Sequence, residues 1–300
     1  MPVLVVPSIT PFKADRVDHD AIHALTAFYR KKGVPGLFPL GTTGEFVMLS
    51  ETERRDALES FVSAAQGEMQ VIAHIGAATT REVIRLGEHA ASIGITAAAV
   101  VTPYFFTYTQ PELEAFYREV CAALPTLKIY AYTIPSRTGN TLEVSTVERL
   151  TDIENLVGIK DSSGDMNRLL DLLGIERLAV YAGADSLALP FMLRGGAGLV
   201  SGLGSAIPEV FAFFARALEQ GDPAAQASAY RLIRSFNALL RGGSRLDYIR
   251  IALEWRGIET GHSRAPLPRA GGAEREALLA GLGAFTLEAQ IAGCELEGVQ

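Results

Sequence analysis

Short apolar runs alternate with amphipathic segments along the first two thirds of the chain. Several of the runs are apolar along their whole length, which is typical of strands covered on both faces. The segments between them repeat apolar residues at intervals of three and four, as helices do. The eight predicted strands are VLVVP (3–7), GLFPLG (36–41), QVIAHIG (70–76), AAAVVTP (97–103), KIYAYTIP (128–135), LVGIKD (156–161), LAVYAG (178–183) and GLVSGL (198–203).

Three of the intervening segments begin with the Ser/Thr-x-x-Glu pattern of a helix capping box. The pairs are Ser50 and Glu53, Thr79 and Glu82, and Thr109 and Glu112. Eight strand–helix units predict an α/β fold, a (β/α)8 TIM barrel over residues 1–220. A doubly wound sheet is the alternative, but no G-x-G-x-x-G follows the first strand. Residues 221–300 predict three helices, a C-terminal extension packed on the barrel.

Composition narrows the classes of function. The 300 residues are 48% hydrophobic and 20% charged, with a net charge of −7, which disfavours nucleic acid as a partner. Cys121 and Cys294 are far apart and predict no disulfide framework. The opening MPVLVVPSITPF predicts a strand and not a signal peptide, and no apolar run has the length of a membrane span. We therefore expect a cytoplasmic protein without a membrane partner.

Lys160 is the residue that most needs an explanation, because it ends an apolar strand, where desolvating a charge is costly. Partial burial in a barrel disfavours the ammonium form, and a neutral amine can attack a ketone to form a Schiff base. The structural alternative is an ion pair with Asp161. Neighbours on a strand point to opposite faces, so the chemical interpretation is favoured.

Active sites of such barrels form at the C-terminal ends of the strands, and two more strand ends carry reactive groups. The turn GTTGE (41–45) offers clustered N–H groups and two hydroxyls that suit a carboxylate, although glycine-bearing βα turns are common. Tyr132 is a candidate proton shuttle or a structural tyrosine. Arg137 is a candidate clamp for a second carboxylate or a solvated loop residue.

Metal chemistry is not predicted. The five histidines show no Cys/His spacing of a metal site, although His19 and His23 stand four positions apart. His19 and His23 fall on an early amphipathic helix and are expected at its surface. His74 ends the third strand, and we expect it to be a polar residue that lines the mouth of the barrel.

The motifs GTTGE, YTIPSRTG and GIKDSSG, in this order and on these strands, resemble those of the dihydrodipicolinate synthase/N-acetylneuraminate lyase family. The resemblance covers the whole chain, including VTPY after the fourth strand and the helical extension. It implies a pyruvate-dependent class I aldolase that needs neither metal nor other cofactor. By the same resemblance, Lys160 forms the Schiff base, and the protein is a homotetramer built as a dimer of dimers.

The resemblance also implies roles for other residues. Tyr132 passes protons during carbinolamine formation and carbon–carbon bond making or breaking. Thr42 and Thr43 hold the pyruvate carboxylate, and the hydroxyl of Thr42 also touches the tyrosine. The backbone carbonyl of Val200 borders the pocket, and Arg137 matches the arginine that places the carboxylate of aspartate semialdehyde in the synthases.

Two departures from the family pattern bear on the substrate. After the fourth strand the synthases carry P-Y-Y, whose second tyrosine completes a proton relay in a neighbouring subunit; here Tyr104 is followed by Phe105, which carries no exchangeable proton. After the seventh strand the chain reads AGADS, with Gly183 and Asp185 as candidate substrate-binding residues. Ser186 stands where sialic acid lyases place a glutamate, and Asp185 either binds a hydroxyl or, preferably, caps the next helix.

The leading hypothesis is a Schiff-base aldolase that releases or uses pyruvate and acts on a 2-oxo-3-deoxy sugar acid or a similar 4-hydroxy-2-oxo acid. The alternative is dihydrodipicolinate (4-hydroxy-tetrahydrodipicolinate) synthase, which Arg137 favours and Phe105 disfavours. A dehydratase using the same Schiff base and a non-catalytic 2-oxo acid binding protein stay open as further alternatives.

Overall fold

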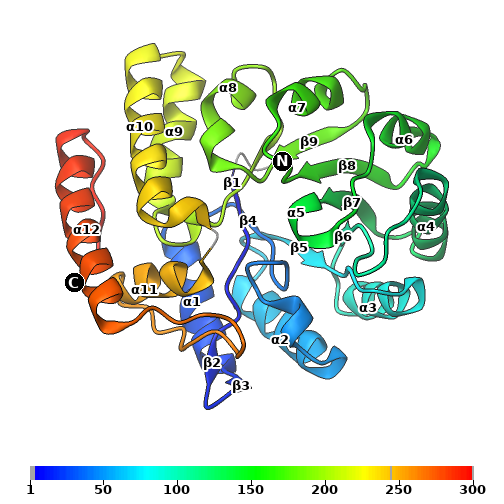
Figure 1. Cartoon of the computed structure of the whole chain (residues 1–300), viewed down its shortest axis with the longest axis horizontal. Helices are drawn as coiled ribbons and strands as arrows, with labels where there is room; N and C mark the ends of the chain where they lie inside the picture. Colours follow the sequence, from blue (N-terminus) through cyan, green and yellow to red (C-terminus); the bar gives the residue numbers. More distant parts are fainter. Residues whose placement is uncertain (1–3, 244, 299–300) are drawn as a thin grey trace.

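Eight parallel strands close into a barrel in the computed structural model, which describes residues 4–243 and 245–298 (Figure 1). The order around the barrel is β1-β10-β9-β8-β7-β6-β5-β4, and β1 pairs with β4 to close it. The predicted (β/α)8 fold is confirmed; Val3, expected to begin the first strand, lies outside the described residues. The strands are β1 (Leu4–Val6), β4 (Gly36–Leu37), β5 (Gln70–His74), β6 (Ala97–Val101), β7 (Lys128–Thr133), β8 (Leu156–Asp161), β9 (Ala179–Ala182) and β10 (Gly198–Val200).

Alternation along the strands separates two apolar cores. In β6, Ala97, Ala99 and Val101 face the barrel interior, where they pack with Phe38 and tyrosines from β7 and β9. The intervening Ala98 and Val100 pack outward in the larger core shared with the helices. Strands buried on both faces are apolar at every position, which explains the unbroken runs of the sequence.

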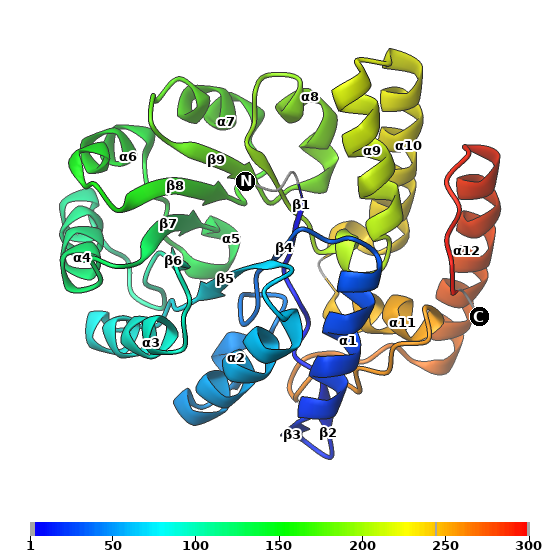
Figure 2. The ribbon, with the colours of Figure 1, turned by 180° about the vertical axis from the view of Figure 1, so that it is seen from behind.

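Helices surround the barrel on its outer side (Figures 1 and 2). The Ser50–Glu53 capping box forms as predicted, and the Thr79 hydroxyl accepts a hydrogen bond from the Glu82 N–H at 3.3 Å. No helix of the described residues is long and apolar enough to cross a membrane. The helices of the barrel are α1 (His19–Lys31), α2 (Glu51–Ala65), α3 (Thr80–Ser92), α4 (Gln110–Ala123), α5 (Pro135–Thr138), α6 (Val144–Arg149), α7 (Met166–Leu173), α8 (Ala188–Met192) and α9 (Pro208–Gln220), and the short 3₁₀ turns are η1 (Phe46–Met48), η2 (Leu150–Asp152), η3 (Asp185–Leu187) and η4 (Leu203–Ser205).

The three C-terminal helices are α10 (Pro223–Leu239), α11 (Leu246–Trp255) and α12 (Gly272–Ile291), with the 3₁₀ turn η5 (Arg241–Gly243) between the first two. They gather on one side of the barrel, where α10 packs on α9 (Figures 1 and 2). Arg256, which ends α11, binds Glu209 of α9 with an Nη2–Oε1 distance of 2.5 Å and joins the extension to the barrel. The division into two domains at residue 220 stays a prediction.

A small antiparallel hairpin between β1 and α1 was not expected from the sequence. Its strands, β2 (Phe12–Lys13) and β3 (Arg16–Val17), are only two residues long. Ala14 and Asp15 form the turn with φ values of 47° and 63°. Two-residue strands give no measurable period, and the turn lacks the glycine that normally marks such a loop, so the pattern could not reveal it.

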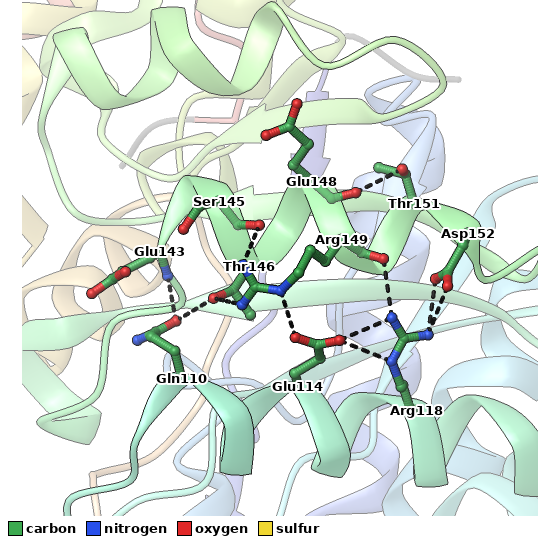
Figure 3. Close-up of polar contacts among 10 residues, drawn as sticks. All are labelled: Gln110, Glu114, Arg118, Glu143, Ser145, Thr146, Glu148, Arg149, Thr151 and Asp152. Atoms are coloured by element: carbon green, nitrogen blue, oxygen red, sulfur yellow. Dashed lines mark hydrogen bonds and ion pairs between the residues drawn. The ribbon is translucent and has the colours of Figure 1, made fainter.

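Polar contacts between α4 and α6 fix the segment that follows β7 (Figure 3). Glu114 lies between two arginines, 2.9 Å from Nη2 of Arg118 and 2.7 Å from Nε of Arg149. The side-chain oxygen of Gln110 accepts hydrogen bonds from the Glu143 N–H at 3.0 Å and the Thr146 hydroxyl at 2.8 Å. These contacts secure the chain shortly after α5, the short helix that carries Arg137.

Candidate active site

Lys160 points into the barrel at the C-terminal end of β8. It is 7% exposed, and its Nζ lies 3.9 Å from the ring centroid of Tyr132 and 4.8 Å from that of Phe38. Asp161 points to the opposite face, where it pairs with Arg168 at 2.7 Å. The structural alternative, an ion pair between Lys160 and Asp161, is therefore excluded.

Tyr132 occupies the position beside Lys160 on the neighbouring strand β7. Its ring is almost fully buried, and its hydroxyl lies 3.1 Å from the Oγ1 of Thr42, close enough for a hydrogen bond. The tyrosine and the lysine thus meet through adjacent strands, and the threonine reaches them from the turn after β4.

The GTTGE turn is held by a buried ion pair that the sequence analysis missed. Glu45 has a left-handed backbone (φ 57°), and its Oε1 lies 2.6 Å from Nη2 of Arg250 on α11. Its Oε2 accepts a hydrogen bond from the Arg264 N–H at 3.1 Å. Arg250 also donates to the carbonyls of Thr10 and Thr260. The signal in the sequence was an arginine inside the apolar segment YIRIAL of the predicted helix.

The strand ends open into a cavity of about 730 Å³. Every residue that the sequence analysis assigned to catalysis or substrate binding lines it. Part of the lining comes from η5, α11 and the loop after it, to which the sequence analysis assigned no site residue. The predicted residues that line the cavity are Thr42, Thr43, Tyr132, Arg137, Lys160, Gly183, Asp185 and Val200.

Arg137 and Asp185 are two further ionisable residues that line this cavity. Arg137 is exposed and forms no ion pair with any residue that the structure describes. Burial raises the pKa of Asp185 to about 7, although a hydrogen bond from Ser201 and the nearby charge of Lys160 act in the other direction. The expected helix cap is wrong: the side chain of Asp185 caps neither η3 nor α8 and instead lies beside Ser201.

Gly183, which follows β9, permits the chain to approach Lys160 closely. A Cβ at this position would lie 2.1 Å from Oγ of Ser162 and 3.3 Å from Cε of Lys160. A side chain here would therefore displace Ser162 and crowd the lysine.

His74 does not line the mouth as predicted. Its ring is 2% exposed and packs behind the cavity wall, 4.5 Å from the ring of Phe46 and 6.0 Å from that of Tyr132. Its Nδ1 lies 2.8 Å from the carbonyl oxygen of Leu40, and burial lowers its pKa well below the usual value. The lowered pKa keeps the imidazole neutral. Because its Nδ1 is turned toward the carbonyl oxygen of Leu40, the ring packs behind the wall and does not line the cavity. His19 and His23 lie exposed on α1, as expected.

The loop after β6 presents Phe105 to solvent. Phe105 is 87% exposed with a φ of 81°, and it does not line the cavity of its own chain, whereas Tyr104 does. The amide of Asn140 fixes this loop by donating to the carbonyls of Pro103 and Phe106 and by accepting from the Tyr108 N–H. Strong local hydrogen bonding can maintain a left-handed backbone at a non-glycine residue.

Among residues 4–243 and 245–298, no group of three His, Cys, Asp or Glu side chains is arranged to hold a metal ion. Cys121 and Cys294 are both buried and unpaired.

Comparison with known proteins agrees with this geometry. The model of the dihydrodipicolinate synthetase family matches residues 2–284. The chain belongs to this family. The expectation of a carbon–carbon lyase of the class I aldolase type is thereby confirmed.

Two relatives and one solved structure show how closely the family members agree. An uncharacterised DapA-like lyase of Halobacterium salinarum is 36% identical, covering 93% of this chain and 92% of the relative. A 4-hydroxy-tetrahydrodipicolinate synthase of Phenylobacterium zucineum is also 36% identical, covering 93% and 95%. The structure of YagE, a family member from Escherichia coli K12 in complex with pyruvate, superposes with a TM-score of 0.91 at 26% identity, covering 95% and 99%.

Proposed function

We propose that this member of the dihydrodipicolinate synthetase family is a pyruvate-dependent aldolase that acts on a 2-oxo-3-deoxy sugar acid or a similar 4-hydroxy-2-oxo acid. The observation that carries the proposal is the arrangement of Lys160, Tyr132 and Thr42 in one cavity. The amine lies over the tyrosine ring, and the tyrosine hydroxyl lies 3.1 Å from the threonine. A nucleophilic amine beside a proton carrier is what Schiff-base chemistry requires.

In the cleavage direction, the neutral amine of Lys160 attacks the 2-oxo carbon, and loss of water leaves an iminium ion. Tyr132, which has given its phenol proton to the water lost as the iminium ion forms, accepts the proton of the 4-hydroxyl group while the C3–C4 bond breaks and the aldehyde departs. The electron pair of that bond passes into the iminium ion and forms an enamine. Protonation at C3, followed by addition of water to the imine, releases pyruvate and regenerates the amine. Condensation follows the same steps in reverse.

The turn between Gly41 and Gly44 is the proposed binding site for the substrate carboxylate. Thr42 and Thr43 supply hydroxyl groups there, and clustered backbone N–H groups favour anions. Val200 lines the same cavity. Support for pyruvate as the ligand comes from YagE, whose structure is described as a complex with pyruvate.

The second candidate is 4-hydroxy-tetrahydrodipicolinate synthase, which condenses pyruvate with aspartate semialdehyde. Arg137 favours it, because an arginine without a partner among the described residues can bind the carboxylate of the semialdehyde in a bidentate manner. The relative from Phenylobacterium zucineum carries this name. Phe105 disfavours it, because phenylalanine cannot act in a proton relay.

The same proposal includes a homotetramer in the cytoplasm that uses no cofactor and no metal. Two exposed aromatic side chains support an assembly: Phe105 is 87% and Phe106 66% exposed, and their ring centroids lie 5.0 Å apart. Clusters of this kind mark interaction surfaces. Sedimentation of the purified protein tests the tetramer, and activity after treatment with a chelator tests the independence from metal.

A paired assay separates the two candidates. Release of pyruvate from 2-keto-3-deoxygluconate and related acids is followed with lactate dehydrogenase, and condensation of pyruvate with aspartate semialdehyde is measured in parallel. The proposal expects kcat/KM to be higher for at least one sugar acid. Efficient use of the semialdehyde with no cleavage of any sugar acid would favour the synthase instead.

A further inference from the structure

The N-terminal end of α11 forms part of the wall of the active-site cavity. Arg245, Leu246, Asp247 and Ile249 all line it. Ile249 approaches the carboxylate end of the site, because a Cβ on Gly202 would lie 3.6 Å from its Cδ1 and 4.0 Å from Oγ1 of Thr43. The side chains of α11 that precede Ile249 are therefore in a position to contact the remainder of a long substrate.

Arg245 and Asp247 form a bidentate ion pair in this wall. The Nε–Oδ1 distance is 2.9 Å and the Nη2–Oδ2 distance is 2.6 Å. The side chains are 22% and 8% exposed, and Arg245 also lies over the ring of Tyr248 at 5.0 Å. Both side chains are thus fixed before any ligand arrives, which lowers the entropy lost on binding.

The pairing determines which ligand groups this wall suits. An anion would be attracted by Arg245 but repelled by Asp247 and by Glu274, whose Oε1 lies 3.4 Å from Nη1 of Arg245, so this wall gives little net attraction for an anion. A hydrocarbon chain would remove the water that is hydrogen-bonded to both side chains and could form no hydrogen bonds in its place. A hydroxyl group satisfies both, since each carboxylate oxygen keeps a lone pair that can accept its proton and the guanidinium keeps N–H groups that can donate to its oxygen.

We propose that Asp247 and Arg245 determine specificity by binding hydroxyl groups of the aldehyde portion of the substrate, so that the partner of pyruvate is a polyhydroxylated aldehyde. This inference rests on the proposed aldolase function. Asn237 of α10 lines the same cavity and extends the polar surface available to a hydroxylated chain.

The test compares two aldehydes of equal chain length, the four-carbon sugar erythrose and butanal, in condensation with pyruvate. Asp247→Asn is the test variant, and Arg245→Gln is the second. Glu254→Gln is the matched control, because Glu254 lies on the same helix in an exposed ion pair with Arg275. Trapping of pyruvate with borohydride in each variant reports whether the fold and the reactive lysine are intact.

We expect the wild type to prefer erythrose and both test variants to lose about tenfold or more in kcat/KM for erythrose, as expected when a hydrogen bond to a charged group is lost. In both test variants kcat/KM for butanal should change by less than about twofold. In the control, kcat/KM for either aldehyde should change by less than about twofold, because the exposed ion pair contributes little. Equal losses for both aldehydes, or no preference in a wild type that traps pyruvate, would overturn the inference. Failure of the wild type to trap pyruvate would instead overturn the proposed function.

Discussion

The buried ion pair between Glu45 and Arg250 should matter for both stability and substrate binding. Glu45 is 2% exposed and Arg250 is 3% exposed, and burial lowers the pKa of Arg250 while Glu45 opposes that shift. Glu45→Gln removes the negative charge but keeps the shape of the side chain. The guanidinium of Arg250 then stays buried without a carboxylate partner. One amide N–H group of the new side chain lies near the backbone N–H of Arg264.

Removal of one partner from a buried pair costs about 3–5 kcal/mol. We expect Glu45→Gln to lower the free energy of unfolding by about 3 kcal/mol, since the amide oxygen can still accept a hydrogen bond. With an unfolding entropy of about 2.1 cal/mol/K per residue, this loss corresponds to a decrease in Tm of roughly 5 °C for a chain of this length. Because the turn also carries Thr42 and Thr43, KM for pyruvate should rise by roughly tenfold.

Urea unfolding measures the effect on stability, with Trp255, the single tryptophan, as the fluorescent probe on α11. Glu254→Gln in the exposed pair with Arg275 is the control and should cost no more than about 1 kcal/mol. Combining Glu45→Gln with Arg250→Gln should cost clearly less than the sum of the single changes, as coupled residues do. The reasoning is refuted if Glu45→Gln destabilises no more than the control or if the two losses simply add.

Three further changes test the geometry of the site. Tyr132→Phe removes the hydroxyl that meets Thr42, so aldol turnover should fall by about 10²–10⁴-fold while the variant still binds pyruvate; unchanged turnover would exclude Tyr132 as the proton carrier. Gly183→Ala places a methyl group 2.1 Å from Oγ of Ser162, so pyruvate trapping should slow while the circular dichroism spectrum is unchanged, and trapping at the wild-type rate would contradict the close approach. The pKa of Asp185 is raised to about 7, so the protonated carboxyl stabilises the fold fully below about pH 4, and this contribution is lost as the pH rises through 7. Asp185→Asn has no such loss, so its Tm should rise relative to that of the wild type between pH 5 and 8. Parallel Tm profiles of the two proteins would refute the raised pKa.

The sequence predicted the barrel because each strand is buried on both faces and so appears as an unbroken apolar run. It also predicted which strand ends converge, since parallel strands bring their C-terminal ends to one mouth. The side chains of Lys160 and Asp161 point to opposite faces of the sheet, which follows from the alternation of side chains along a strand. These features depend on local periodicity and on a topology with few alternatives.

Contacts between distant segments could not be predicted in this way. The partner of Glu45 lies 205 positions away on α11, and no local pattern links the two. The position of His74 depends on which way its ring turns, which the carbonyl of Leu40 determines. The contribution of Arg245 and Asp247 to the cavity depends on how the extension packs on the barrel, so a helix that looked purely structural became part of the site.

The most direct test of the central claim is borohydride trapping with pyruvate, read by intact mass and peptide mapping on wild type and Lys160→Ala. The account predicts a reduced pyruvyl adduct on Lys160 in the wild type and no adduct in the variant. An unmodified wild type, after reduction in the presence of saturating pyruvate, would contradict the Schiff-base mechanism.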